Sequence, residues 1–169
     1  LFSSTVRESY PDQLQQLAFN NDAALMKALR QFRNQQMVRI AWRDLAGWSD
    51  LDETLSDLTA LAESCIQFTL DYLYQQASAR KGTPVLENGQ TQNIIILGMG
   101  KLGAWELNYS SDIDLIFAYQ QDGTLDDRKE TSYGEFFGRI CRQLVKILDE
   151  VTADGFVFRT DIRLRPFGE

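Results

Sequence analysis

Apolar side chains recur at helical spacing in the first part of the chain. Leu25, Leu29 and Phe32 stand at positions i, i+4 and i+7, which places them on one face of an α-helix. Asp50 precedes a second, longer stretch of the same kind and has the position of a helix N-cap. The pattern predicts that residues 1–77 are helical and form a layer that packs on the rest of the chain.

The apolar pattern changes after residue 77. The next segment contains the dipeptide Asn88-Gly89, a strong signal for a tight turn, so we expect a linker with room for a small hairpin at residues 78–92. Short apolar runs then alternate with one amphipathic stretch, and they predict strands at 94–97, 112–117 and 156–164 and a helix at 133–151. This order predicts an α+β fold with a mixed sheet in residues 93–169.

Four arginines share the first predicted long helix: Arg30, Arg33, Arg39 and Arg43. A series of like charges on a helix is more often a solvated face than a binding face. We therefore expect these side chains to be exposed to solvent, and a surface for a ligand or a partner is the alternative.

Size and charge limit the classes of function. The chain has 169 residues and a formal net charge of −7, which argues against non-specific binding to nucleic acid. No apolar run has the length of a membrane span. The sequence begins with Leu1 instead of Met and shows no signal peptide, so we expect an excised, C-terminally incomplete fragment of a cytoplasmic protein.

Cysteine and histidine usage removes further classes of chemistry. Cys65 and Cys141 each lie in a helical apolar pattern, which favours two buried thiols over a disulfide. The chain has no histidine, so catalysis by Ser-His-Asp or Cys-His groups and zinc sites with imidazole ligands are excluded within it. Any bound metal would be held by oxygen atoms, which suits Mg²⁺ or Mn²⁺.

Two carboxylates open the second predicted strand. Asp112 and Asp114 alternate with the apolar Ile113 and Leu115, so both carboxylates lie on one face, about 7 Å apart along the strand. Two neighbouring buried carboxylates without a partner are costly. A divalent cation is the simplest way for them to coexist.

The last predicted strand carries a third carboxylate. Its odd positions place Asp161 between arginines on one face, at Arg159, Arg163 and Arg165. A salt-bridged surface strand is the plain interpretation. Next to Asp112 and Asp114, however, Asp161 would complete an oxygen-rich site for two metal ions, and the arginines would suit phosphate oxygens.

Glycines follow the first predicted strand in the order of the dinucleotide-binding fingerprint, at Gly98, Gly100 and Gly103. Only about eight residues separate Gly103 from the next strand, too few for the crossover helix of such a fold. A tight turn whose N–H groups approach a phosphate, with Lys101 close by, is the better interpretation.

A glycine turn, a hydrophobic-flanked Asp-x-Asp and a later Asp resemble the nucleotidyltransferase pattern of polymerase-beta-like enzymes. The sequences of residues 30–47, 98–119 and 158–169 further resemble bacterial glutamine synthetase adenylyltransferase, a bifunctional adenylylating and deadenylylating enzyme. This resemblance covers essentially the whole chain. It implies a polymerase-beta-like catalytic core over residues 93–169, with the closer likeness to the N-terminal, deadenylylating half.

The resemblance also implies a mechanism. Asp112, Asp114 and Asp161 would hold two Mg²⁺ ions, or Mn²⁺, while inorganic phosphate attacks the adenylyl phosphorus, the tyrosine oxygen leaves, and ADP forms as the product. The implied phosphate- or nucleotide-binding residues are Gly98, Gly100, Lys101, Ser111, Arg163 and Arg165. Adenylylated glutamine synthetase is the implied protein substrate, and the PII signal protein is an implied partner.

Three alternatives remain open from the sequence. The paralogous half of the family adds AMP from ATP, and the two halves resemble each other. A regulatory module could keep the fold without metal, although the intact Asp112, Asp114 and Asp161 argue against this. A sensor could bind ATP or ADP without turnover.

Overall fold

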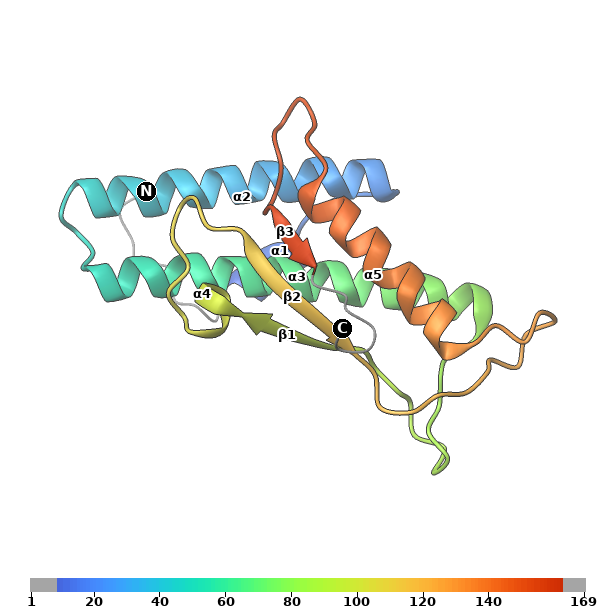
Figure 1. The fold of residues 1–169 in the computed structure, drawn as a ribbon. Helices are drawn as coiled ribbons and strands as arrows, with labels where there is room; N and C mark the ends of the chain where they lie inside the picture. Colours follow the sequence, from blue (N-terminus) through green and yellow to red (C-terminus); the bar gives the residue numbers. More distant parts are fainter. Residues whose placement is uncertain (1–8, 163–169) are drawn as a thin grey trace.

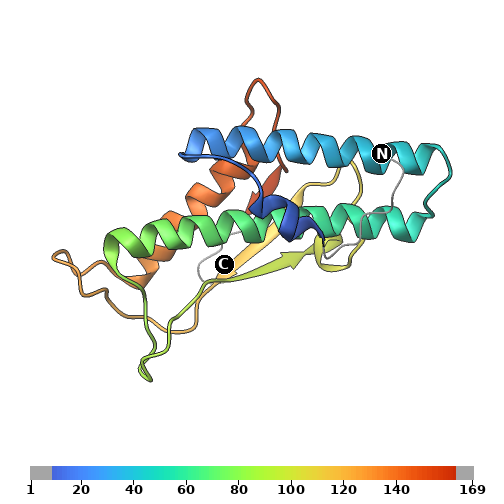
Figure 2. The same ribbon diagram turned by 180° about the vertical axis from the view of Figure 1, so that it is seen from behind.

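Two long antiparallel helices are the largest elements of the structure. The computed structural model describes residues 9–162, and in it α2 (Asp22–Leu45) and α3 (Leu51–Lys81) lie side by side (Figure 1). The short α1 (Ser9–Gln15) lies against α3 on the far side (Figure 2). Asp50 caps α3 by accepting a hydrogen bond from the Glu53 amide at 2.8 Å, as its position in the sequence predicts.

The connection to the sheet is shorter than the sequence suggests. Helix α3 runs to Lys81, so the first residues of the expected linker are helical, and Gly82 ends the helix with φ +90°. The predicted tight turn is present: Gly89 has φ +79°, and Val85 and Thr91 form an antiparallel bridge around it. The division of the chain into separate domains stays a prediction.

Three strands form a mixed sheet in the order β1-β2-β3. β1 (Ile95–Met99) is antiparallel to β2 (Ile113–Ala118), which is parallel to β3 (Thr160–Ile162). The α+β class is confirmed, and the polymerase-beta-like character of the core stays a prediction. Within the described residues β3 is shorter than expected, because it begins at Thr160 and not at Phe156.

Helix α5 (Tyr133–Asp149) connects β2 to β3 and packs against α3, with further contacts to α2 and β3. Ser132 caps it by accepting a hydrogen bond from the Glu135 amide at 3.1 Å. Phe137 and Leu144 on its apolar face and Ile113 and Leu115 of β2 are buried in one core. The sheet and α5 lie on the same side of the α2–α3 pair (Figures 1 and 2).

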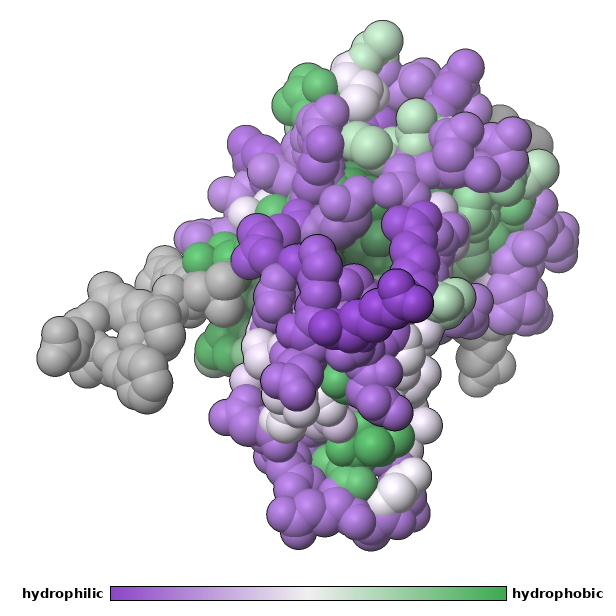
Figure 3. Space-filling view, turned by 90° about the vertical axis from the view of Figure 1, so that its right-hand side faces the viewer, coloured by the Kyte–Doolittle hydropathy of each residue, from purple (hydrophilic) through white to green (hydrophobic). Residues whose placement is uncertain are grey.

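The opposite face of the sheet is open. Ile95, Leu97, Met99 and Ile116 are between 37% and 49% exposed there. By contrast, the end of the molecule on the right of Figure 1 is mainly hydrophilic, with hydrophobic residues in small separate patches (Figure 3). Among the helices of residues 9–162, none combines the length and apolarity that crossing a membrane requires.

The expectation that the α2 arginines form a solvated face is wrong. Arg30 is fully buried, Arg39 and Arg43 are less than 9% exposed, and Arg33 is half-buried. The physical reason is that α2 has neighbours on several sides, and these supply acceptors for the guanidinium groups. Arg39, for example, donates to Asp57 at 2.7 Å within a buried ion pair.

Arg30 joins α2 to a part of the chain that is more than a hundred residues away. Its guanidinium donates to the carbonyls of Ile147 at 3.0 Å and Gly155 at 2.8 Å, and also to those of Met26 and Glu150. Two of these carbonyls belong to the C-terminal end of α5, where the helix itself cannot satisfy them. Arg30 therefore fixes the segment that leads from α5 to β3.

Both cysteines are buried and free, as the sequence predicts. Burial raises the pKa of the Cys65 thiol to about 12 and that of Cys141 to about 11. These thiols are core residues and show none of the thiolate character that catalysis by cysteine requires.

Candidate active site

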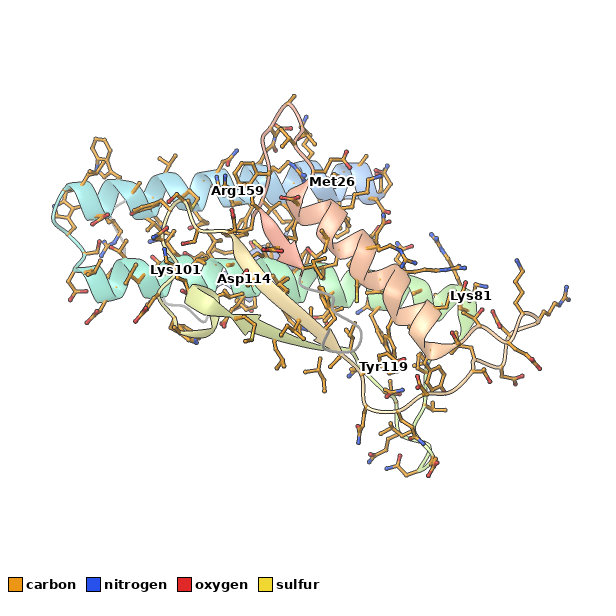
Figure 4. All side chains as sticks on the ribbon, viewed as in Figure 1. Met26, Lys81, Lys101, Asp114, Tyr119 and Arg159 are labelled. Carbon is orange, nitrogen blue, oxygen red and sulfur yellow. The ribbon has the colours of Figure 1, made fainter. Side chains whose placement is uncertain are left out.

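The sheet places two of the three predicted carboxylates opposite each other. Asp114 of β2 and Asp161 of β3 are register partners in the parallel pair. Met99 of β1 is the partner of Asp114 on its other side, so the three residues form one row across the sheet. A cleft of about 290 Å³ lies over this row and is lined by Met99, Gly100, Asp114, Leu115, Ile116 and Asp161. Asp114 lies next to the first turn of α4 in Figure 4.

The glycine turn reaches this cleft from the end of β1. Gly100 begins the short α4 (Gly100–Gly103) with φ +55°, a conformation that favours glycine. A Cβ atom at Gly100 would lie 3.0 Å from Oδ2 of Asp114, so a side chain there would crowd the carboxylate. A Cβ atom on Gly103 would lie 2.4 Å from the carbonyl oxygen of Gly98. The glycines thus allow a tight turn after β1 that brings the backbone of Gly100 beside Asp114.

This turn excludes the dinucleotide-binding interpretation of the glycine pattern. Such a fold joins parallel strands through a crossover helix. Here the glycine turn joins β1 to β2, which are antiparallel neighbours. Lys101 is exposed on α4, beside the site (Figure 4). Its role toward phosphate, like those of Gly98 and Gly100, stays a prediction.

Asp112 has a different neighbour. It lies one residue before β2, and its Oδ1 atom is 2.6 Å from Nε of Arg159. Arg159 also donates from Nη2 to the carbonyl of Ser110 at 2.9 Å. Among residues 9–162, no group of three acidic, cysteine or histidine side chains is arranged to hold a metal ion. The structure therefore brings Asp114 and Asp161 together and leaves Asp112 in an ion pair.

The turn before Asp112 is organised by Asn108. Its side-chain oxygen accepts hydrogen bonds from the Ser111 hydroxyl at 2.7 Å and from the Ser110 amide at 3.2 Å. Ser111 thus supports the turn, and its predicted contact with phosphate is a proposal. The predicted phosphate ligands Arg163 and Arg165 lie outside the described residues.

The donor set fits Mg²⁺ or Mn²⁺. Asp114 and Asp161 supply carboxylates to the lining of the cleft. Mg²⁺ is commonly held by one or two carboxylates, with water and substrate phosphate completing its shell. Asp114 and Asp161 alone therefore meet the protein's share of such a site.

The sequence placed Arg159 among the arginines that would suit phosphate oxygens, but it did not predict the ion pair of Arg159 with Asp112. The alternation in the sequence places it on the face of Asp161, but that pattern gives no reason to assign it to Asp112. The signal that identifies it is the register, since Ile113 pairs with Thr160 and the preceding residues on both strands become neighbours.

Comparison of the sequence with known proteins shows the family of the chain. A sequence profile of the family described as glutamate-ammonia ligase adenylyltransferase matches residues 3–169. The chain belongs to this family. The resemblance inferred from its motifs is thereby confirmed.

The adenylyltransferase relatives are close in sequence and much longer. The bifunctional glutamine synthetase adenylyltransferase/adenylyl-removing enzyme of Methylococcus capsulatus is 52% identical over 145 residues, which cover 86% of this chain and 15% of that protein. The enzyme of the same name from Shewanella frigidimarina is 46% identical over 172 residues, covering 100% of this chain and 18% of the relative. The chain thus spans less than a fifth of the relatives' length, and their names combine two activities.

Proposed function

We propose that this chain forms part of the catalytic site at which AMP is removed from an adenylylated tyrosine of glutamine synthetase. The reaction is a phosphorolysis that depends on Mg²⁺ or Mn²⁺ and releases ADP. The observation that supports this most directly is the pairing of Asp114 with Asp161 beside Gly100, because it offers two oxygen ligands and open backbone in one cleft. The family's known nucleotidyltransferase relatives support the same class of chemistry.

The chemistry follows from what the residues supply. Asp114 and Asp161 would bind the divalent cation, which would neutralise charge on the transferred adenylyl group. The absence of a side chain at Gly100 keeps Oδ2 of Asp114 accessible, and Lys101 adds a positive charge nearby. An oxygen of inorganic phosphate forms a bond to the adenylyl phosphorus, the bond from phosphorus to the tyrosine oxygen breaks, and that oxygen takes up a proton. Phosphate is already anionic near neutral pH, so a chain without histidine needs no strong base.

The direction of the reaction is supported by the sequence near the site. Residues 108–114 and 160–166 resemble the adenylyl-removing half more closely than the adding half. Addition of AMP from ATP is the second candidate, because both reactions make and break a bond to the same phosphorus with the same carboxylates. A cytoplasmic location and regulation by the PII signal protein belong to the proposal as well.

Two labelled reactions with the full-length protein test this assignment. One offers adenylylated glutamine synthetase with labelled phosphate, and the other offers unmodified glutamine synthetase with labelled ATP. We expect labelled ADP in the first reaction, and we expect it to be lost in Asp114→Asn and Asp161→Asn. Asp126→Asn, at an exposed acid in the β2–α5 connection, is the matched control and should keep full activity.

The result against the proposal is equally specific. If Asp114→Asn leaves phosphorolysis intact and abolishes the labelling of unmodified glutamine synthetase by ATP, this site adds AMP. If both reactions survive in Asp114→Asn and Asp161→Asn, the site is not catalytic.

A further inference from the structure

Arg159 lies one residue before β3 and Asp112 lies one residue before β2, next to the row of site residues on these strands. The register pairs Ile113 with Thr160 and Asp114 with Asp161, and the Ile113 amide donates to the carbonyl of Arg159 at 2.9 Å. Asp112 and Arg159 each lie two residues before a member of the carboxylate pair, which places all four side chains on one face. Arg159 is therefore the one positively charged side chain among these four, and the other three are carboxylates.

The guanidinium contacts of Arg159 are specific but accessible. Nε lies 2.6 Å from Asp112, and Nη2 donates to Ser110 at 2.9 Å. The side chains of Arg159 and Asp112 are 54% and 55% exposed. An ion pair with this exposure changes the equilibrium constant for a competing binding event by only about two- to fivefold, because water screens the pair. A divalent cation that binds the same carboxylate can displace it.

We propose that Arg159 exchanges partners when metal binds. Without metal it neutralises Asp112 and holds the Ser110 turn. When a divalent cation occupies the cleft, Asp112 turns to that cation, and the released guanidinium binds the oxygens of the incoming phosphate. Guanidinium suits this second role, because it can donate two parallel hydrogen bonds to a phosphate. This inference rests on the proposed function.

A permanent brace is the competing interpretation, and it predicts the opposite sign. If Arg159 held Asp112 ready for metal, removal of the guanidinium would weaken metal binding. If Arg159 competes with metal, its removal strengthens metal binding and weakens the later binding of phosphate.

The experiment measures Mn²⁺ binding to the full-length protein by electron paramagnetic resonance of the free ion. Mn²⁺ bound by the wild type but not by Asp114→Asn reports on this site alone. In the absence of phosphate and nucleotide, we expect Arg159→Gln to bind this Mn²⁺ about two- to fivefold more tightly. Inorganic phosphate, titrated into the Mn²⁺-loaded protein by calorimetry, should bind Arg159→Gln about tenfold or more weakly.

Two variants control for general effects. Arg139→Gln removes another exposed arginine from an ion pair, that with Glu135 on α5, and should change neither affinity. Arg159→Lys keeps the charge without the planar fork, so phosphate affinity should be intermediate.

Each remaining outcome is decisive. Unchanged or weaker Mn²⁺ binding in Arg159→Gln overturns the exchange, even where phosphorolysis depends on Asp114 as proposed. Tighter Mn²⁺ binding with unchanged phosphate affinity overturns the second step. If the wild type binds no more Mn²⁺ than Asp114→Asn, the proposed metal site itself is refuted, and the exchange is refuted with it.

Discussion

Replacement of Arg30 by methionine tests the link between α2 and the end of α5. Methionine keeps an apolar stem of similar reach and removes the guanidinium. The change leaves the buried carbonyl of Ile147 and the partly buried carbonyls of Glu150 and Gly155 without their side-chain donor. The Gly155 carbonyl keeps a bond from the Thr152 amide, whereas the two α5 carbonyls lie at a helix end.

The expected cost follows from these carbonyls and the lost charge. A buried acceptor without a partner costs about 1–3 kcal/mol. One such acceptor at Ile147, together with the lost charge-assisted bonds to the partly buried carbonyls of Glu150 and Gly155, gives about 3–5 kcal/mol, and this range already allows for the relief of no longer burying a guanidinium. The loss of stability should be largest in the segment that leads from the end of α5 to β3.

Native-state hydrogen exchange of the full-length protein measures this directly. A loss of 3 kcal/mol or more corresponds to exchange at least about 100-fold faster for the protected amides of α5. Arg80→Met, at an exposed arginine near the end of α3, is the control and should change these rates by no more than about twofold. If Arg30→Met accelerates exchange by less than about fivefold, the buried hydrogen bonds do not stabilise α5 as argued.

Two further predictions concern the glycine turn and the acid side of the stability curve. Gly100→Ala should destabilise the protein by about 1 kcal/mol in urea unfolding and also weaken Mn²⁺ binding, because the new Cβ atom would meet Asp114. Gly47→Ala is the control: Gly47 has φ +68° and open space around it, so this change should show the backbone cost alone. Equal Mn²⁺ binding by the two variants would contradict the prediction. Hydrogen bonds from the backbone and hydroxyl of Thr131 hold the pKa of Asp127 well below its usual range. The stability that this carboxylate contributes is therefore present above about pH 4 and is lost as pH falls through the lowered pKa. The difference in free energy of unfolding between the wild type and Asp127→Asn should therefore decrease below about pH 4. A difference that stays constant in urea titrations down to about pH 2 would refute the assignment.

Local patterns predicted the elements that local forces determine. The apolar spacing located the long helices, Asp50 marked the start of α3, and Asn88-Gly89 marked a turn. These signals act over a few residues, so one sequence contains them. The burial of Arg30 was mispredicted because three of its four carbonyl acceptors stand at positions 147, 150 and 155, more than a hundred residues away in the chain.

The candidate site was predictable in kind but not in detail. Alternation along each strand indicated that Asp114 and Asp161 face the same way, and the structure pairs them. Which residue lies opposite Asp112 depends on the register between β2 and β3, and no pattern within either strand fixes that register. The ion pair with Arg159 therefore became visible only in three dimensions.

The parallel pairing of β2 with β3 has a consequence for the order of folding. β1 and β2 are antiparallel neighbours joined by a short connection, so their pairing closes only a small loop. The pairing of Asp114 with Asp161 must await the whole of α5, and contacts between residues so distant in sequence form slowly. On a ribosome, a nascent chain that has not yet released β3 carries Asp114 without its partner. The two halves of the carboxylate pair thus meet only after α5 and β3 have both been made.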